Sequence, residues 1–167
     1  METKTIALVG PESTGKSTLC EKLSAHFEVP WVPEFARSYL EAGNLVKSPQ
    51  DLVYIAKEQI KSQNINRSIL FIDNDLYNIV VWSEVVFGEC DSWLLEQEER
   101  EHHDLYLLTK PDIPWVPDGL RVSPFLREKL WNRYRNRLIE KKRNFVEIEG
   151  ENENRFQNSL LAIQNHL

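Results

Sequence analysis

Short apolar runs alternate with longer amphipathic segments along the whole chain. Each run is as long as a strand buried in a parallel sheet, and between the runs apolar residues recur every three or four positions, as on one face of a helix. The runs cover residues 4–9, 29–32, 69–73, 105–108 and 145–148. This alternation predicts an α/β fold: a five-stranded, doubly wound parallel sheet flanked by helices.

Capping and breaking residues place the ends of the helices between these runs. Ser48 and Pro49 suit the cap and first turn of one helix, and Gly88 stops another. The predicted helices reach from the glycine-rich turn to 27, over 34–42, from 48, over 76–87, from 91, over 123–142 and after Gly150. Three prolines exclude a regular helix from residues 110–122 and predict a loop. No linker divides the chain, so we predict a single domain, 1–167.

Composition narrows the class of protein. The 167 residues are 41% hydrophobic and carry a net charge of −6, so no overall basic field favours nucleic acid. No apolar run approaches the length of a membrane span, and the first residues lack the pattern of a signal peptide. The two cysteines, Cys20 and Cys90, suit free thiols, so we expect a cytoplasmic protein without a membrane partner. Composition leaves the oligomeric state open.

The turn after the first apolar run carries the most specific motif. Residues Gly10 to Ser17 read GPESTGKS and fit the P-loop pattern GxxxxGK[ST]. Lys16 would reach the β- and γ-phosphates of ATP, and Ser17 would hold Mg²⁺. The remaining residues expected to bind the nucleotide are Gly10, Glu12, Ser13, Thr14, Gly15 and Thr18.

Two carboxylates follow the third run. Asp73 ends the apolar stretch 69–72, the Walker-B arrangement, where it would hold Mg²⁺ with Ser17. The alternative is an aspartate that caps the next helix. Asp75 is the better candidate for that cap, and it could instead contact the substrate.

Glu34 directly follows the second run. In small-molecule kinases, a carboxylate at this position can orient the acceptor hydroxyl and take its proton. An acid stabilised at a helix N-terminus explains Glu34 equally well. Arg37, one turn later, could pair with Glu34 or with a phosphate.

The segment 110–127 is expected to act as a lid. Its loop bears Trp115 and Arg121, and Arg127 follows; a lid must exclude water and bring positive charge to the transferring phosphoryl group. We predict Arg121 as catalytic, Arg127 as nucleotide-binding and Trp115 as substrate-binding. A solvated helix with basic residues explains the later cations of this region.

Two other patterns favour no special site. Thr109 to Asp112 reads TKPD, similar to the guanine-reading segment of GTPases, but Asp73 is not followed by the DxxG glycine of those proteins. His102 and His103 are adjacent, so they do not share a helix face, and a solvated pair explains them better than a metal site does.

Taken together, these motifs resemble the ribosylnicotinamide kinase domain of the NadR family. The matching segments are Gly10–Ser17, Glu34–Arg37, Phe71–Asp75 and Trp115–Arg121. The resemblance implies transfer of a phosphoryl group from ATP, with Mg²⁺, to the 5′-hydroxyl of ribosylnicotinamide. It places Glu34 and Arg37 in the substrate-side motif, Asp73 and Asp75 in the motif after the third run, and Arg121 in the lid. The adenylyltransferase and DNA-binding parts of that family have no counterpart here, so only the kinase step is expected. Pro33 replaces the aromatic residue that precedes the substrate motif in the family.

The sequence therefore predicts a small-molecule kinase with Lys16, Glu34, Asp73 and Arg121 as catalytic residues. Two alternatives stay open: a nucleotide-dependent regulatory ATPase or binding module, which would not need Glu34, and a kinase for a different nucleoside or nucleotide.

Overall fold

A parallel sheet of five strands lies at the centre of the protein, in the order β2-β3-β1-β4-β5. The structure is a computed structural model that describes residues 3–117 and 124–167. The strands are β1 (Lys4–Val9), β2 (Trp31–Val32), β3 (Ile69–Asp73), β4 (Leu105–Thr109) and β5 (Phe145–Ile148). The predicted five-stranded, doubly wound sheet is confirmed.

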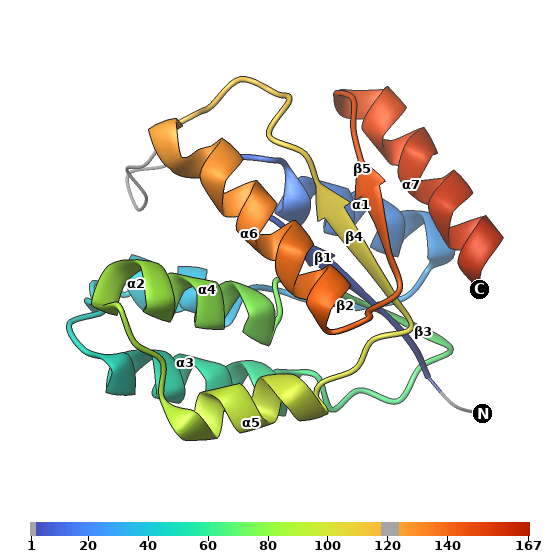
Figure 1. The fold of residues 1–167 in the computed structure, drawn as a ribbon. Helices are drawn as coiled ribbons and strands as arrows, with labels where there is room; N and C mark the ends of the chain where they lie inside the picture. Colours follow the sequence, from blue (N-terminus) through green and yellow to red (C-terminus); the bar gives the residue numbers. More distant parts are fainter. Residues whose placement is uncertain (1–2, 118–123) are drawn as a thin grey trace.

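Helices cover both faces of the sheet (Figure 1). Alternate residues of β1 separate the two cores: Ile6 and Leu8 face α1 (Lys16–Phe27) and α7 (Asn152–His166), whereas Ala7 and Val9 face α4 (Leu76–Phe87) and α6 (Arg127–Glu140). A strand buried on both faces must be apolar at every position, which is why β1 reads as a continuous apolar run.

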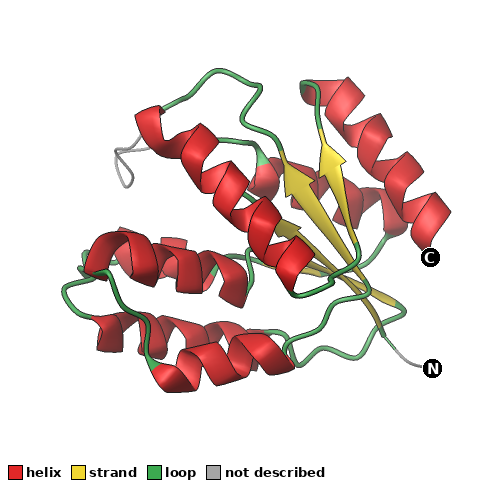
Figure 2. Cartoon of the chain, viewed as in Figure 1, coloured by secondary structure: helices red, strands yellow, loops and turns green. Residues whose placement is uncertain are grey.

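A third apolar cluster lies away from the sheet, around α4. There α2 (Phe35–Glu41), α3 (Pro49–Ser62) and α5 (Ser92–Arg100) pack with α4, and Figure 2 shows these helices gathered below the sheet in that view. Within the described residues, no helix combines the length and the apolar character that crossing a membrane requires. The layer formed by α2, α3 and α4 becomes one wall of the site described below.

The boundaries differ most from the prediction at two places. The strand predicted over 29–32 is only Trp31–Val32, because Val29 bonds instead to Ser24 at the end of α1. The helix predicted over 123–142 is a 3₁₀ turn, Pro124–Leu126, followed by α6 from Arg127.

The predicted solvated histidine pair is wrong for one of its members. His102 is exposed and contacts Arg143, but His103 is only 4% exposed and packs edge-on against Tyr106. The imidazole of His103 lies beside the N-terminal cap of α4, with Nε2 4.0 Å from Asp75 Oδ2.

Candidate functional site

The P-loop follows β1 and wraps the N-terminus of α1. Gly10 has φ +140°, and a Cβ there would lie 2.7 Å from Thr109 Oγ1 and 2.9 Å from Thr109 O, so only glycine fits against β4. Gly15 caps α1 with φ +78°, also in the left-handed region. The loop therefore aims its backbone N–H groups and the positive helix end at one point, as an anion site requires.

The lysine of the loop is buried within it. Lys16 is 5% exposed, and its Nζ donates a hydrogen bond of 2.7 Å to Pro11 O. Thr14 Oγ1 also donates to Pro11 O, at 2.9 Å, and lies 2.6 Å from Thr109 Oγ1. Thr18 is exposed on the first turn of α1. The loop is thus held in shape by β4, with the lysine already turned toward its centre.

Ser17 and Asp73 come together as the sequence predicts. Ser17 Oγ donates to Asp73 Oδ2 at 2.5 Å, and Asp73 is 1% exposed at the end of β3. They meet because β1 and β3 are neighbours, with Leu8 opposite Asp73 in the register. A hydroxyl and a carboxylate oxygen are the ligand types that Mg²⁺ prefers, so this pair fits the metal expected beside a P-loop nucleotide.

The loop after β4 packs on the P-loop. Val116 N donates to Ser13 Oγ at 2.9 Å, and Arg127 donates to Ser13 O at 2.9 Å and to Ile113 O at 2.8 Å. Arg127 thus ties the start of α6 to both loops. Trp115 belongs to the same segment and is not among the residues that line the cavity described below. Arg121 lies outside the described residues.

The TKPD segment is held by structural contacts. Asp112 accepts hydrogen bonds from Gly150 N and from the guanidinium of Arg155, and Lys110 pairs with Glu147 and Glu149. Arg155, only 4% exposed, also donates to Thr14 O of the P-loop at 2.7 Å. The segment therefore helps to hold Arg155 of α7 against the P-loop.

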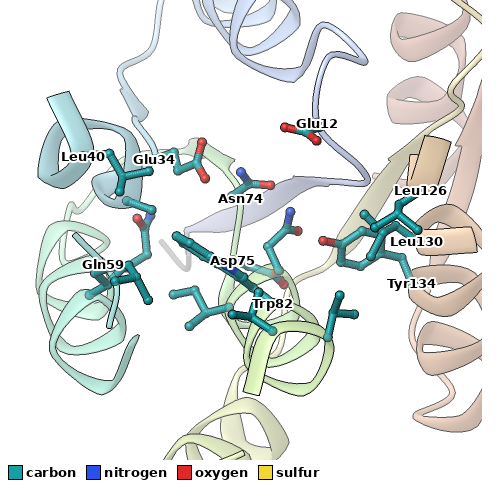
Figure 3. A pocket seen from close by; sticks show the side chains of 17 residues that line it. Glu12, Glu34, Leu40, Gln59, Asn74, Asp75, Trp82, Leu126, Leu130 and Tyr134 are labelled. Atoms are coloured by element: carbon teal, nitrogen blue, oxygen red, sulfur yellow. The ribbon is translucent and has the colours of Figure 1, made fainter. Parts of the chain in front are cut away.

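A cavity of about 370 Å³ opens beside the P-loop, at the carboxyl ends of β2 and β3. Its size is that of a small-ligand pocket. The lining comes from the P-loop, α2, the segment before α3, α3, the β3–α4 turn, α4, the 3₁₀ turn and α6 (Figure 3). Its members are Glu12, Glu34, Ala36, Leu40, Val46, Ile55, Gln59, Asn74, Asp75, Asn78, Ile79, Trp82, Val85, Val86, Leu126, Leu130 and Tyr134.

The cavity is acidic at one end. Glu12, Glu34 and Asp75 line it, and no described lining residue is lysine, arginine or histidine. Glu34 is 8% exposed and precedes the first residue of α2, without a side-chain capping bond. Arg37 lies on α2 but is not among the lining residues. The structure thus brings Glu34 and Asp75 to one cavity, and it adds Glu12 of the P-loop to the same lining.

Asp75 has two roles in the structure. It caps α4 by accepting a hydrogen bond of 3.0 Å from Tyr77 N, and it lines the cavity. Burial, with the carboxylates of Glu101 and Glu98 nearby, raises the pKa of Asp75 well above its usual range. Behind it, Asp75, Glu101 and His103 place one potential ligand atom each within 4.8 Å of one another, so they could also hold a cation.

The sequence prediction missed the contribution of α4. Asn78, Ile79, Trp82, Val85 and Val86 all line the cavity, at the three- and four-residue spacing of a single helix face that begins at the predicted Asp75. The available signal was the order of side chains along this face of α4, which is polar near Asp75 and becomes aromatic and aliphatic from Ile79 to Val86. Trp82, rather than Trp115, is the tryptophan of this wall.

Known proteins resemble this chain in sequence. The sequence model of the family described as "AAA domain" matches residues 5–155. The trifunctional NAD biosynthesis/regulator protein NadR of Escherichia coli K12 is 29% identical over 161 residues, which is 89% of this chain and 38% of NadR. The NadR of Salmonella typhimurium LT2 is also 29% identical, over 71% of this chain and 31% of that protein. The chain thus spans about a third of the curated relatives that it matches.

Solved structures share the fold. A NadR protein in complex with NR has a TM-score of 0.79 and 23% identity, over 98% of this chain and 51% of that one. Deoxyadenosine kinase of M. mycoides has a TM-score of 0.65 and 14% identity, over 96% of this chain and 97% of that one. The expected resemblance to NadR and the kinase-like P-loop fold are both confirmed. With the family model matched over residues 5–155, the chain belongs to the AAA domain family of P-loop proteins.

Proposed function

We propose that the protein is an ATP-dependent kinase that phosphorylates the 5′-hydroxyl of ribosylnicotinamide, giving nicotinamide mononucleotide. The observation that carries this proposal is the cavity beside the P-loop, acidic near the loop and apolar farther along α4. The NadR relatives support it, since one of them is solved in complex with NR.

The charge of the cavity favours this acceptor. Ribosylnicotinamide carries a permanently cationic pyridinium ring, and Glu12 and Glu34 are carboxylates of the described lining; Asp75 adds less negative charge, because burial raises its pKa. The face of Trp82 offers a cation–π contact to such a ring. An acceptor that already bears a phosphate would need a lysine or arginine in the wall, which the described lining lacks. We therefore favour a nucleoside over a nucleoside monophosphate.

The residues divide the reaction among them. Lys16 and the P-loop amides bind the β- and γ-phosphates, and Ser17 with Asp73 would hold Mg²⁺, which neutralises charge on the phosphates when bound. Glu34 orients the acceptor hydroxyl and takes its proton as the oxygen attacks the γ-phosphorus and ADP leaves. Arg127 steadies the P-loop, and we assign neutralisation of the transferring group to Arg121. The proposed work of the protein is positioning and charge stabilisation.

ADP release from MgATP tests the proposal. We expect strong stimulation by ribosylnicotinamide, weaker stimulation by ribosides with neutral bases, none by nucleoside monophosphates, and loss of the activity when EDTA removes Mg²⁺. Stimulation by a neutral nucleoside alone would keep the mechanism but refute the assigned acceptor. ADP release that no acceptor stimulates would favour the regulatory ATPase instead.

A further inference from the structure

Three carboxamides in the cavity wall have buried hydrogen-bonding atoms without partners in the described part of the chain. Asn74 is 3% exposed, and neither its Oδ1 nor its Nδ2 makes a hydrogen bond within residues 3–117 and 124–167. Asn78 Oδ1 and Gln59 Nε2 likewise have no partner in the described part of the chain. Buried polar groups are almost always paired, because an unpaired one loses its water without compensation. Such a set, gathered in one cavity, indicates a polar ligand.

The carboxamide of Asn74 is held at a fixed place. Its backbone N donates to Leu8 O at 3.1 Å, extending the pairing of β3 with β1, and its φ of +62° turns the chain into α4. Figure 3 shows the side chain between Glu34 and Asp75, at the same end of the cavity as Glu12. Asn78, one turn into α4, donates to Gly10 O of the P-loop at 3.1 Å, and its Oδ1 is buried without a partner among the described residues.

The position of Asn74 and Asn78 in the cavity wall determines which part of the ligand they contact. The wall directly follows Asp73, so it faces the end of the acceptor that carries the reacting hydroxyl, whereas Trp82 lies farther along α4. In a nucleoside that end is the sugar. A carboxamide offers both a donor and an acceptor, which matches a pair of neighbouring hydroxyls.

We propose that Asn74, with Asn78 beside it, is the specificity-determining residue that binds the vicinal hydroxyls of the acceptor's ribose. The inference rests on the proposed kinase function and deepens it, since it makes the enzyme selective for ribosides over deoxyribosides. A site built around hydroxyl groups rejects an analogue that lacks one, because its own buried groups then stay unpaired.

The variant Asn74→Gly tests this with little disturbance of the backbone. Glycine adopts a φ of +62° without strain, so the side chain is lost without a change of the backbone. We expect wild-type kcat/KM to fall at least about 100-fold when ribosylnicotinamide is replaced by its 2′- or 3′-deoxy counterpart. In Asn74→Gly, kcat/KM for the riboside should fall about 10- to 100-fold and the preference for ribose should largely vanish.

The same change at Asn152 is the matched control. Asn152 is exposed at the start of α7 and also has a positive φ, of +45°. Asn152→Gly should leave the ribose preference unchanged. Equal use of riboside and deoxyriboside by the wild type, or an intact preference in Asn74→Gly, would overturn the inference while leaving the kinase function standing.

Thermal unfolding without ligand gives an independent readout. If Asn74 serves the ligand, removing an unpaired buried carboxamide should leave the Tm unchanged or raise it. A fall in Tm well beyond that of Asn152→Gly would make Asn74 a structural residue and overturn the inference, even if no nucleoside were phosphorylated.

Discussion

Glu34 is the acid on which acceptor-dependent turnover should depend most. Its side chain is buried at the end of β2 and lines the cavity beside the P-loop. Glutamine has the same shape but does not take a proton, so Glu34→Gln should lower kcat by about 10²- to 10⁴-fold. The affinity for ATP should not change, because the nucleotide is bound by the P-loop. Steady-state ADP release and calorimetric titration with ATP measure the two effects.

Glu41 supplies the control for this change. It is exposed at the other end of α2 and does not line the cavity. Glu41→Gln should leave both kcat and ATP affinity as in the wild type. If Glu34→Gln also turned over normally, Glu34 would be an acid of the helix N-terminus and not the base.

Gly10 tests how closely the P-loop is held against β4. In Gly10→Ala, the new Cβ would meet Thr109 Oγ1 and Thr109 O at 2.7 and 2.9 Å, closer than real Cβ contacts. The loop or the strand must shift, so we expect the free energy of unfolding to fall by about 3 kcal/mol or more, with weaker ATP binding. Chemical denaturation and ATP titration measure these changes.

Gly43 separates the clash from backbone strain. It has φ +83°, but nothing lies within 4 Å of a Cβ built there. Gly43→Ala should therefore cost only about 1–2 kcal/mol, the usual cost of a left-handed residue with a side chain, and should not affect ATP binding. Equal losses in both variants would mean that the contact with Thr109 is unimportant.

At the scale of elements, α4 supplies the side of the cavity that we expect to determine which acceptor binds. Trp82 lies on its cavity-lining face, beyond Asn74 and Asn78. Leucine at position 82 keeps an apolar surface but loses the aromatic face, so Trp82→Leu should lower kcat/KM for ribosylnicotinamide roughly 5- to 30-fold. Its effect on a riboside with a neutral base should be smaller. Kinetics with both acceptors measure the difference.

Trp93 is the corresponding control on α5. It packs against the cluster around α4, with Lys57 above its ring, and does not line the cavity. Trp93→Leu should lower the Tm without changing the relative use of the two acceptors. A parallel loss for cationic and neutral acceptors in Trp82→Leu would show that Trp82 only shapes the cavity.

The elements themselves could be predicted because their signals are local. Buried parallel strands are apolar throughout, and the P-loop is a contiguous motif, so both can be read directly from the sequence. The walls of the cavity were harder to predict, because the lining by Asn78 and Trp82 depends on which face of α4 turns away from the sheet. The burial of His103 depends on packing against Tyr106, which no local pattern records.

Contacts between residues far apart in the chain could not be predicted from the sequence pattern. Arg155 and Thr14 are 141 residues apart, yet the guanidinium of Arg155 donates to the carbonyl of Thr14. In the sequence, Arg155 is one more charged residue in the polar first turn of the last helix. The order of the strands explains the contact: β4 lies between β1 and β5, and the loops after all three meet at one edge of the sheet.

At the scale of the whole molecule, Arg155 couples the C-terminal helix to the nucleotide site. Its guanidinium donates to Thr14 O at 2.7 Å, to Gly150 O at 2.6 Å and to Lys110 O at 3.1 Å, and it pairs with Asp112. Arg155→Met would leave these acceptors unpaired, so we expect the free energy of unfolding to fall by about 2–4 kcal/mol. ATP should also bind more weakly, because the P-loop loses a support.

Arg133, whose pair with Glu84 is exposed, provides the control: Arg133→Met should cost less than about 1 kcal/mol and leave ATP affinity unchanged. If Arg155→Met lowered stability with normal ATP affinity, the arginine would support the fold without acting on the P-loop.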